Sequence, residues 1–120
     1  MVDRYKINWR TLKLKPSTYK FLEIVAKSHH EDFVKAIILF GSEAKGEAIL
    51  TSDVDIALIS TRPLTHAERR SIVKDIPFEL ECEVDYRIVC LRESTMTTGK
   101  KLNIGTSIKQ EGVIIYENIS

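Results

Sequence analysis

Residues 34–60 read VKAIILFGSEAKGEAILTSDVDIALIS, and this stretch decides both the fold and the chemistry open to the chain. The segment from Val34 to Phe40 is short, apolar and rich in β-branched residues, and it ends at Gly41. Such a pattern predicts a buried strand that stops at a glycine. A second strand is predicted from Asp53 to Ser60. The segment between the two strands is polar and carries the turn residues.

Two carboxylates open the second strand. Asp53 and Asp55 are two residues apart, so on a strand they project from the same face. The alternating residues face the other way, into the core; these are Val54, Ile56 and Leu58. Two carboxylates held this close repel each other unless a proton or a cation lies between them. Mg²⁺ favours one or two carboxylates together with phosphate oxygens and water, so the pair predicts a magnesium site.

A third carboxylate is expected on another strand, predicted from Glu83 to Leu91. Asp85 shares one face of that strand with Glu83 and Arg87, and the opposite face is formed by Val84, Tyr86, Ile88 and Cys90. If the two strands are neighbours, the three aspartates converge on one patch. Such a patch binds two metal ions and supports in-line displacement at phosphorus, with Asp85 accepting a proton from the attacking hydroxyl. Arg87 either touches a phosphate or forms a local ion pair.

The turn after the first strand supplies the rest of the predicted site. Gly41 lets the backbone approach a ligand, and Ser42 offers a hydroxyl and an amide at an expected helix N-terminus, which favours phosphate. Lys45 adds a flexible positive charge. Each of these features is common by itself, since a lone Asp-x-Asp is usually a polar edge and a lone Gly-Ser is usually a turn. Their combination in this order is far more specific.

The remaining pattern predicts an α+β fold, a small mixed sheet backed by helices. Residues 1–15 form an N-terminal arm in which Trp9 is a packing anchor, laid over the core or paired as a short strand. Residues 16–120 form one domain. The other predicted elements are a helix started by Pro16 and Ser17 and running to about Glu31, a helix from Thr65 to Asp75 with a Thr65/Glu68 capping box, a weaker helix from Gly99 to Gln110, and a last strand from Val113 to Tyr116.

Composition narrows the function. A chain of 120 residues with 43% hydrophobic residues is typical of one globular domain. Its formal net charge of +1 lacks the basic excess typical of proteins that grip nucleic acid, so nucleic acid is not expected as a partner. The charged N-terminus and the lack of a long apolar run predict no membrane association and a cytoplasmic location. Cys82 and Cys90 are expected to be reduced structural thiols.

At these motifs the chain resembles the polymerase-β-like nucleotidyltransferase superfamily, and within it the minimal nucleotidyltransferases. The resemblance is carried by Leu39-Phe-Gly-Ser42, Ala44, Gly46, Ser52-Asp-Val-Asp55, Val84-Asp85 and the tail from Ile108 to Tyr116.

The resemblance implies a nucleoside triphosphate donor, usually ATP, with Mg²⁺ held by Asp53, Asp55 and Asp85. Gly41 and Ser42 would contact the donor phosphates. Minimal members commonly accompany a small helical partner of the HEPN type in toxin–antitoxin pairs, and some neutralise that partner by transferring AMP to a tyrosine. The expected function is therefore transfer of a nucleoside monophosphate, AMP from ATP, to a hydroxyl of a partner protein.

Two alternatives stay open. The family often has arginine at positions 43 and 45, where this chain has Glu43 and Lys45, so the first alternative is an antitoxin that has lost catalysis and acts by binding its partner. The second is a nucleotidyltransferase for a small molecule or RNA, which is disfavoured because such enzymes generally add an acceptor-binding domain and little chain follows Tyr116. Tyr5 and Trp9 on the arm are expected to be exposed and to serve a partner contact or a homodimer.

Overall fold

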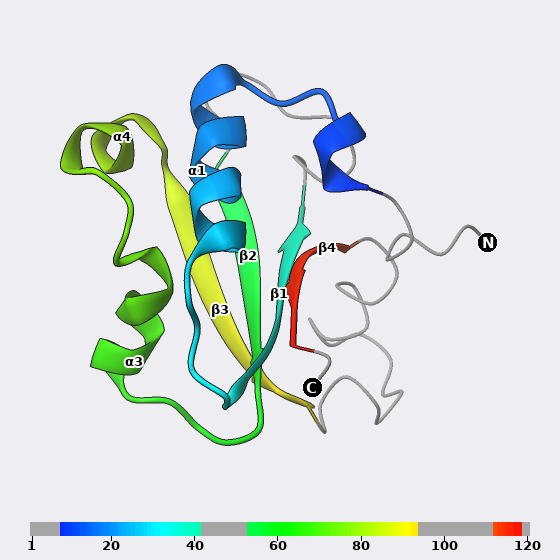
Figure 1. The fold of residues 1–120 in the computed structure, drawn as a ribbon, viewed down its shortest axis with the longest axis vertical. Helices are drawn as coiled ribbons and strands as arrows, with labels where there is room; N and C mark the ends of the chain where they lie inside the picture. The colour runs from blue at the N-terminus through cyan, green and yellow to red at the C-terminus, as the bar shows by residue number, and fades with distance from the viewer. Residues whose placement is uncertain (1–7, 42–52, 94–111, 119–120) are drawn as a thin grey trace.

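The fold is a four-stranded mixed sheet with helices packed against one face (Figure 1). The computed structural model describes residues 8–41, 53–93 and 112–118. Its strands are β1 (Val34–Phe40), β2 (Val54–Ser60), β3 (Tyr86–Arg92) and β4 (Val113–Glu117), arranged in the order β3-β2-β1-β4. β1 is antiparallel to both β2 and β4, whereas β2 and β3 are parallel. The expected α+β class with a small mixed sheet is confirmed.

The helices are α1 (Pro16–Lys27), α3 (His66–Arg70) and α4 (Phe78–Glu83), with 3-10 turns η2 (Trp9–Thr11) and η3 (Ser71–Val73). Figure 1 shows α1 lying over the sheet, roughly along the direction of the strands, with α3 and α4 beside the β3 edge. The segment from α3 to α4 forms the crossover connection that the parallel β2–β3 pair requires. Among the described residues, no helix has the length and apolar character needed to cross a lipid bilayer.

Alternation along the strands separates two apolar clusters. The main core lies on the α1 side, where Phe21, Leu22 and Val25 of the helix meet the strand residues Ile37, Leu39, Ile56, Leu58 and Val113. A smaller cluster of Ile38, Ala57 and Ile59 lies on the opposite face. A register shift between Val34 and Ala36 lets Val34 join the main core, although it is three residues from Ile37. The face opposite α1 is the one that carries the polar residues of the candidate site.

The first helix begins where the sequence indicates, but not with the expected cap. Pro16 occupies its first turn, and Lys15 rather than Ser17 is the N-cap. Proline presets the backbone angle of a first helical residue, so the helix starts at Pro16 and Ser17 lies inside it. The helix ends at Lys27, four residues before the predicted end, and the hydroxyl of Ser28 donates to the carbonyl of Ile24 at 2.8 Å.

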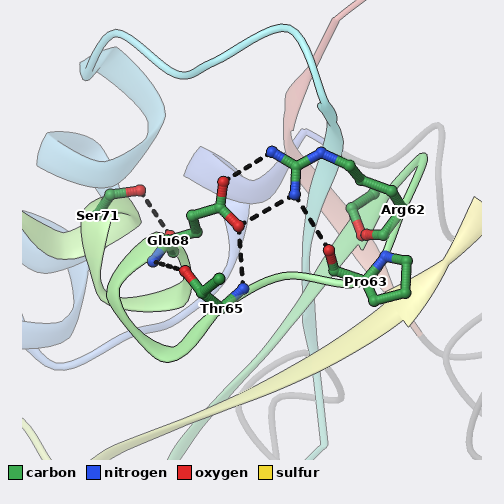
Figure 2. A network of polar contacts seen from close by, with 6 residues as sticks. Arg62, Pro63, Thr65, Glu68 and Ser71 are labelled. Atoms are coloured by element: carbon green, nitrogen blue, oxygen red, sulfur yellow. Dashed lines mark hydrogen bonds and ion pairs between the residues drawn. The ribbon is translucent and has the colours of Figure 1, made fainter.

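The capping box at the start of α3 is confirmed. The amide of Glu68 donates to Thr65 Oγ1 at 3.1 Å, and the amide of Thr65 donates to Glu68 Oε1 at 2.9 Å. Figure 2 shows Arg62 completing this network with two contacts to the Glu68 carboxylate, of 3.0 and 2.7 Å. The helix is shorter than predicted, because its backbone tightens into η3 after Arg70.

The prediction of a third strand from Glu83 was wrong at its start. Phe78–Glu83 form α4, a helix that the sequence did not indicate, and β3 begins only at Tyr86. Glu83 therefore closes a helix and does not share a strand face with Asp85 and Arg87. The strand is anchored to the helix, since the Tyr86 hydroxyl donates to Glu81 Oε1 at 2.9 Å. The predicted helix from Gly99 to Gln110 lies outside the described residues.

The part of the arm that the structure describes belongs to the core. Trp9 is 3% exposed, and its ring lies 5.3 Å from that of Tyr19 on α1. The expectation of an anchor laid over the core is confirmed for Trp9. The short strand is not observed, since Trp9–Thr11 form a 3-10 turn capped by the Asn8 side chain. The expected exposure of Trp9 was wrong because the ring fills a position in the core; Tyr5 lies outside the described residues.

Candidate active site at the end of β2

The candidate carboxylates lie at one end of the central strands. β1 ends as β2 begins, with Phe40 opposite Asp55, and Val54 and Asp55 lie level with Tyr86 and Arg87 of β3. The amide of Val54 donates to the carbonyl of Asp85 at 2.7 Å, so the pairing extends to the residues just before both strands. Asp53 and Asp85 therefore lie level with each other, each one residue before its strand, as the sequence interpretation required.

The residues on the two faces of β2 and β3 are those that the alternation of apolar and polar residues predicts. Val54, Val84 and Tyr86 pack in or against the main core on the α1 side. Asp53 and Asp85 are exposed, while the Asp55 side chain is only 13% exposed. Asp55 and Arg87 touch across the two strands, which places both on the face opposite α1. Burial of the apolar residues thus forces the acidic ones to the other surface.

Arg87 binds Asp55 rather than Asp85. Its Nε donates to Asp55 Oδ1 at 2.9 Å, and its Nη2 lies 2.9 Å from the same oxygen. The hydrogen bond and charge of Asp55, with a further contribution from the charge of Asp53, raise the pKa of Arg87 above its ordinary value. Of the two roles left open for Arg87, the structure shows the ion pair. Its partner could have been inferred from the sequence only by knowing the register of β2 against β3.

Gly41 is held against the second oxygen of Asp55. Its φ angle of +79° lies in the left-handed region that side chains disfavour. A β-carbon on this residue would stand 2.5 Å from Asp55 Oδ2, which is closer than any real contact. The glycine is required here both by its backbone angle and by the approach of the carboxylate. Ser42 and Lys45, the other predicted phosphate contacts, lie outside the described residues.

The donor chemistry of this patch fits a hard divalent cation. Carboxylate oxygens are the ligands that Mg²⁺ prefers, and the starts of the adjacent strands β2 and β3 offer three carboxylates, those of Asp53, Asp55 and Asp85. The Asp55 carboxylate already attracts a cationic group, the guanidinium of Arg87. Within residues 8–41, 53–93 and 112–118, however, no group of three or more His, Cys, Asp or Glu side chains is close enough to hold a metal ion. The joint use of the three aspartates as metal ligands therefore stays a prediction.

Besides these carboxylates, the described ranges hold two thiols and three histidines. Cys82 on α4 and Cys90 on β3 are free thiols, and burial raises the pKa of Cys90. His30 is buried and donates from Nε2 to the carbonyl of Val25 at 2.8 Å. His29 and His66 are exposed, as expected of surface histidines.

Comparison with known proteins settles the family. The family model described as "Polymerase beta, Nucleotidyltransferase" matches residues 22–119, most of the chain. The chain belongs to the polymerase β nucleotidyltransferase family. The match spans the glycine turn, both Asp-x-Asp carboxylates and Asp85, the residues on which the site was predicted. No curated protein matches the chain closely enough to count as a relative.

Some of the solved structures of similar fold are toxin–antitoxin complexes. One is a toxin–antitoxin complex with AMP-PNP, at 18% identity and a TM-score of 0.53, covering 94% of this chain and 76% of that one. Another is a mutant of the MntA–HpeT toxin–antitoxin pair, at 15% identity and a TM-score of 0.51, covering 94% and 75%. A more distant one, from Shewanella oneidensis, is a tri-AMPylated HEPN toxin with its MNT antitoxin, at 18% identity and a TM-score of 0.41, covering 84% and 67%. At these identities the likeness to the first two structures establishes the fold.

Proposed function

We propose that this nucleotidyltransferase moves a nucleoside monophosphate, AMP from ATP, onto a hydroxyl group of a partner protein. The observation that carries the proposal is the register of β2 and β3, with Asp53 level with Asp85 and Asp55 on the same face as Arg87. Together with the family match, this register supports one acidic patch beside the glycine turn. Asp53, Asp55 and Asp85 would hold Mg²⁺, which supplies charge stabilisation on the phosphates.

The transfer is an in-line displacement. The hydroxyl oxygen of the acceptor forms a bond to the α-phosphorus, the bond from that phosphorus to the bridging oxygen breaks, and pyrophosphate leaves. Asp85 accepts the hydroxyl proton, because it is exposed at the edge of the patch where an acceptor can reach it. Gly41 and Ser42 position the donor phosphates, with Lys45 adding positive charge.

The proposed partner is a small helical toxin of the HEPN type, and the chain is its antitoxin in the cytoplasm. The fold similarity to two toxin–antitoxin complexes, one of them with AMP-PNP, supports this partner and this donor. A homodimer stays a prediction that no observation supports.

Two measurements test the activity. Calorimetric titration with ATP and Mg²⁺ should show binding by the natural chain, and Asp53→Asn and Asp55→Asn should each weaken it at least about tenfold. Asp32→Asn is the matched control, because Asp32 is exposed near the other end of β1. This variant should bind ATP as the natural chain does. Incubation with α-labelled ATP, Mg²⁺ and the product of the neighbouring gene should label that product. Absence of label together with absence of metal-dependent ATP binding would reject the enzyme.

A binding antitoxin without catalysis is the second candidate. The ion pair between Asp55 and Arg87 favours it, because a guanidinium then occupies a carboxylate that the metal needs. Under this hypothesis the partner is bound and neutralised equally well by the natural chain and by Asp53→Asn. Loss of neutralisation in Asp53→Asn would exclude it.

A further inference from the structure

A groove runs along α1, between that helix and the segment from Asp75 to Glu83. Two cavities of about 540 and 380 Å³ form it, and they meet at Lys20, which lines both. One row of α1 side chains, spaced three or four residues apart, lines the groove; it consists of Ser17, Lys20, Ile24 and Ser28. The other wall includes Asp75, Pro77, Glu79, Leu80 and Glu83. The α1 row extends about 16 Å, so the groove has the length of a short helix.

The inside of the groove is apolar and continues onto an exposed aromatic ring. Leu80 is 7% exposed and Ile24 is half-buried, so both offer carbon atoms to a ligand while packed in the fold. Phe78 is 76% exposed, more than any other large apolar side chain in the described ranges. It lies between Pro77 and Glu79 in the sequence, and both of these line the groove. Single exposed apolar residues are common, but an aromatic ring beside an apolar groove is typical of a protein-binding surface.

The rim of the groove is acidic, although the chain as a whole has a formal net charge of only +1. The charged groups of its described lining are the carboxylates of Glu23, Asp75, Glu79 and Glu83 and the ammonium groups of Lys20 and Lys27. Lys27 is paired with Glu23 at 2.7 Å, so the excess of negative charge lies toward α4. Glu79 and Glu83 are exposed and four residues apart on α4, which places them on one side of that helix. A basic side chain is the complement of this end of the groove.

We propose that this groove binds an amphipathic helix of the acceptor protein, with basic residues at the end that lies against α4. This inference rests on the proposed function, since it takes the acceptor to be a protein. The apolar face of such a helix packs on Ile24 and Leu80 and against the ring of Phe78, as in other helix-in-groove complexes. Its basic residues pair with Glu79 and Glu83. The same carboxylates repel phosphate groups, so they oppose nucleic acid or an anionic lipid surface in this groove.

The groove also lies where a bound acceptor is useful to the proposed reaction. α4 ends at Glu83, and Asp85 is two residues further along, so at most about 7 Å of backbone separates the acidic end of the groove from the proposed base. Figure 1 shows β3 beginning beside α4. An acceptor held in the groove is therefore anchored next to the residue that takes its proton.

Binding of the fluorescently labelled product of the neighbouring gene to the full chain tests the inference. Glu83→Lys and Phe78→Ala should each weaken this binding about tenfold, the usual effect of removing one important interface contact. Glu83→Lys should also reduce the dependence of the affinity on salt, because one attractive charge has been reversed. Both variants should bind ATP with Mg²⁺ as the natural chain does. In the labelling reaction they should raise the KM for the acceptor and leave kcat unchanged.

Glu31→Lys is the matched control, because Glu31 is an exposed glutamate outside the groove and the change in charge is the same. It should leave acceptor binding unchanged, and thermal unfolding of each variant establishes that the chain is folded. If Glu83→Lys and Phe78→Ala bind the acceptor as tightly as the natural chain, this inference is overturned while the proposed function stands. If sedimentation shows that the two variants lose only self-association, the occupant is a second copy of the chain and the inference is again overturned. If the natural chain binds ATP but not the acceptor, the proposed partner fails together with this inference.

Discussion

At the scale of single residues, the candidate site depends on how closely Gly41 and Asp55 approach each other. The glycine adopts a φ of +79°, and its missing side chain leaves the space that Asp55 Oδ2 uses. The last residue of β1, Phe40, is paired with Asp55, so a shift of the backbone at Gly41 would also move the Asp55 carboxylate. The glycine thus has a conformational and a spatial role at one position.

Gly41→Ala should destabilise the fold and weaken binding of ATP with Mg²⁺. A left-handed conformation costs a residue with a β-carbon about 1–2 kcal/mol, and the added carbon also forces Asp55 to move. The free energy of unfolding can be measured by urea denaturation. A double-mutant cycle separates the two effects, because in an Asp55→Ala background only the conformational cost should remain. Equal costs in both backgrounds would show that the contact with Asp55 is unimportant.

His30 is a buried titratable residue that follows the C-terminal end of α1. Its Nε2 donates to the carbonyl of Val25 at 2.8 Å, and its ring meets the Tyr116 ring edge-on at 4.6 Å. Burial lowers the pKa of His30 below its ordinary value of 6.5, and the nearby charge of Lys74 lowers this pKa further. The bond to Val25 and the charge of Asp75 act in the other direction. The neutral ring is the form that the fold stabilises.

The stability of the protein should therefore fall as the pH falls below about 6.5. The unfolded chain takes up a proton at His30 near that pH, while the folded chain does so only at lower pH, so protonation favours unfolding by at most about 1.4 kcal/mol per pH unit. Urea denaturation between pH 8 and pH 5 measures this dependence. His30→Gln should reduce the slope, whereas His29→Gln, at an exposed neighbour, should not. An unchanged slope in His30→Gln would contradict the assignment.

At the scale of elements, α3 is too short to be stable by itself and depends on its cap. It has five residues, and isolated helices of this length do not persist in water. The Thr65 side chain and the Glu68 carboxylate close the capping box, and Arg62 holds the carboxylate from the other side (Figure 2). The hydrogen bond from Arg62, followed by that from the Thr65 amide, lowers the pKa of Glu68 to about 2. The carboxylate is therefore in its charged, accepting form throughout the neutral range.

Thr65→Ala should lower the free energy of unfolding by about 1 kcal/mol, because the amide of Glu68 loses its acceptor at the helix start. Thr65→Ser keeps a hydroxyl and should retain most of the stability. Thr61→Ala changes an exposed threonine before the helix and serves as a second control. Urea denaturation of the three variants gives the comparison. A loss as large in Thr65→Ser as in Thr65→Ala would indicate that packing of the methyl group, and not the cap, is responsible.

At the scale of the whole molecule, residues 8–15 help to form the domain core. Trp9 is buried against Tyr19, and the guanidinium of Arg10 lies 4.6 Å from the centre of the Trp9 ring. The family match begins only at residue 22, so this segment lies outside the matched region while contributing to the same core.

Trp9→Ala should cost about 3–5 kcal/mol, the usual loss for a large aromatic side chain removed from a core. A loss of this size is a large fraction of the stability of a small domain, so the thermal unfolding midpoint should fall sharply. Arg10→Ala is the control, since an exposed cation–π contact contributes only about 0.5–1 kcal/mol. A small effect of Trp9→Ala would mean that the segment is an appendage.

Much of the fold could be predicted because the strands β1 and β2 are short runs of apolar, β-branched residues. β1 was predicted with its observed bounds, β2 within one residue, and the capping box of α3 was recognised from Thr65 and Glu68. Errors arose at short elements. α4 has six residues in which apolar and acidic residues alternate strictly, and this period of two is typical of a strand rather than of a helix. The N-terminal 3-10 turn has three residues, too few to carry a periodic pattern.

The sequence by itself determined that Asp55 projects from β2 on the side opposite Val54 and Ile56, because hydrophobic alternation fixes which side chains can face water. Only the tertiary structure decided that β2 and β3 are parallel neighbours, that Asp55 is paired with Arg87, and that Gly41 closes on the same carboxylate. Those contacts join residues far apart along the chain, and strand register is set by the packing of the whole sheet on α1.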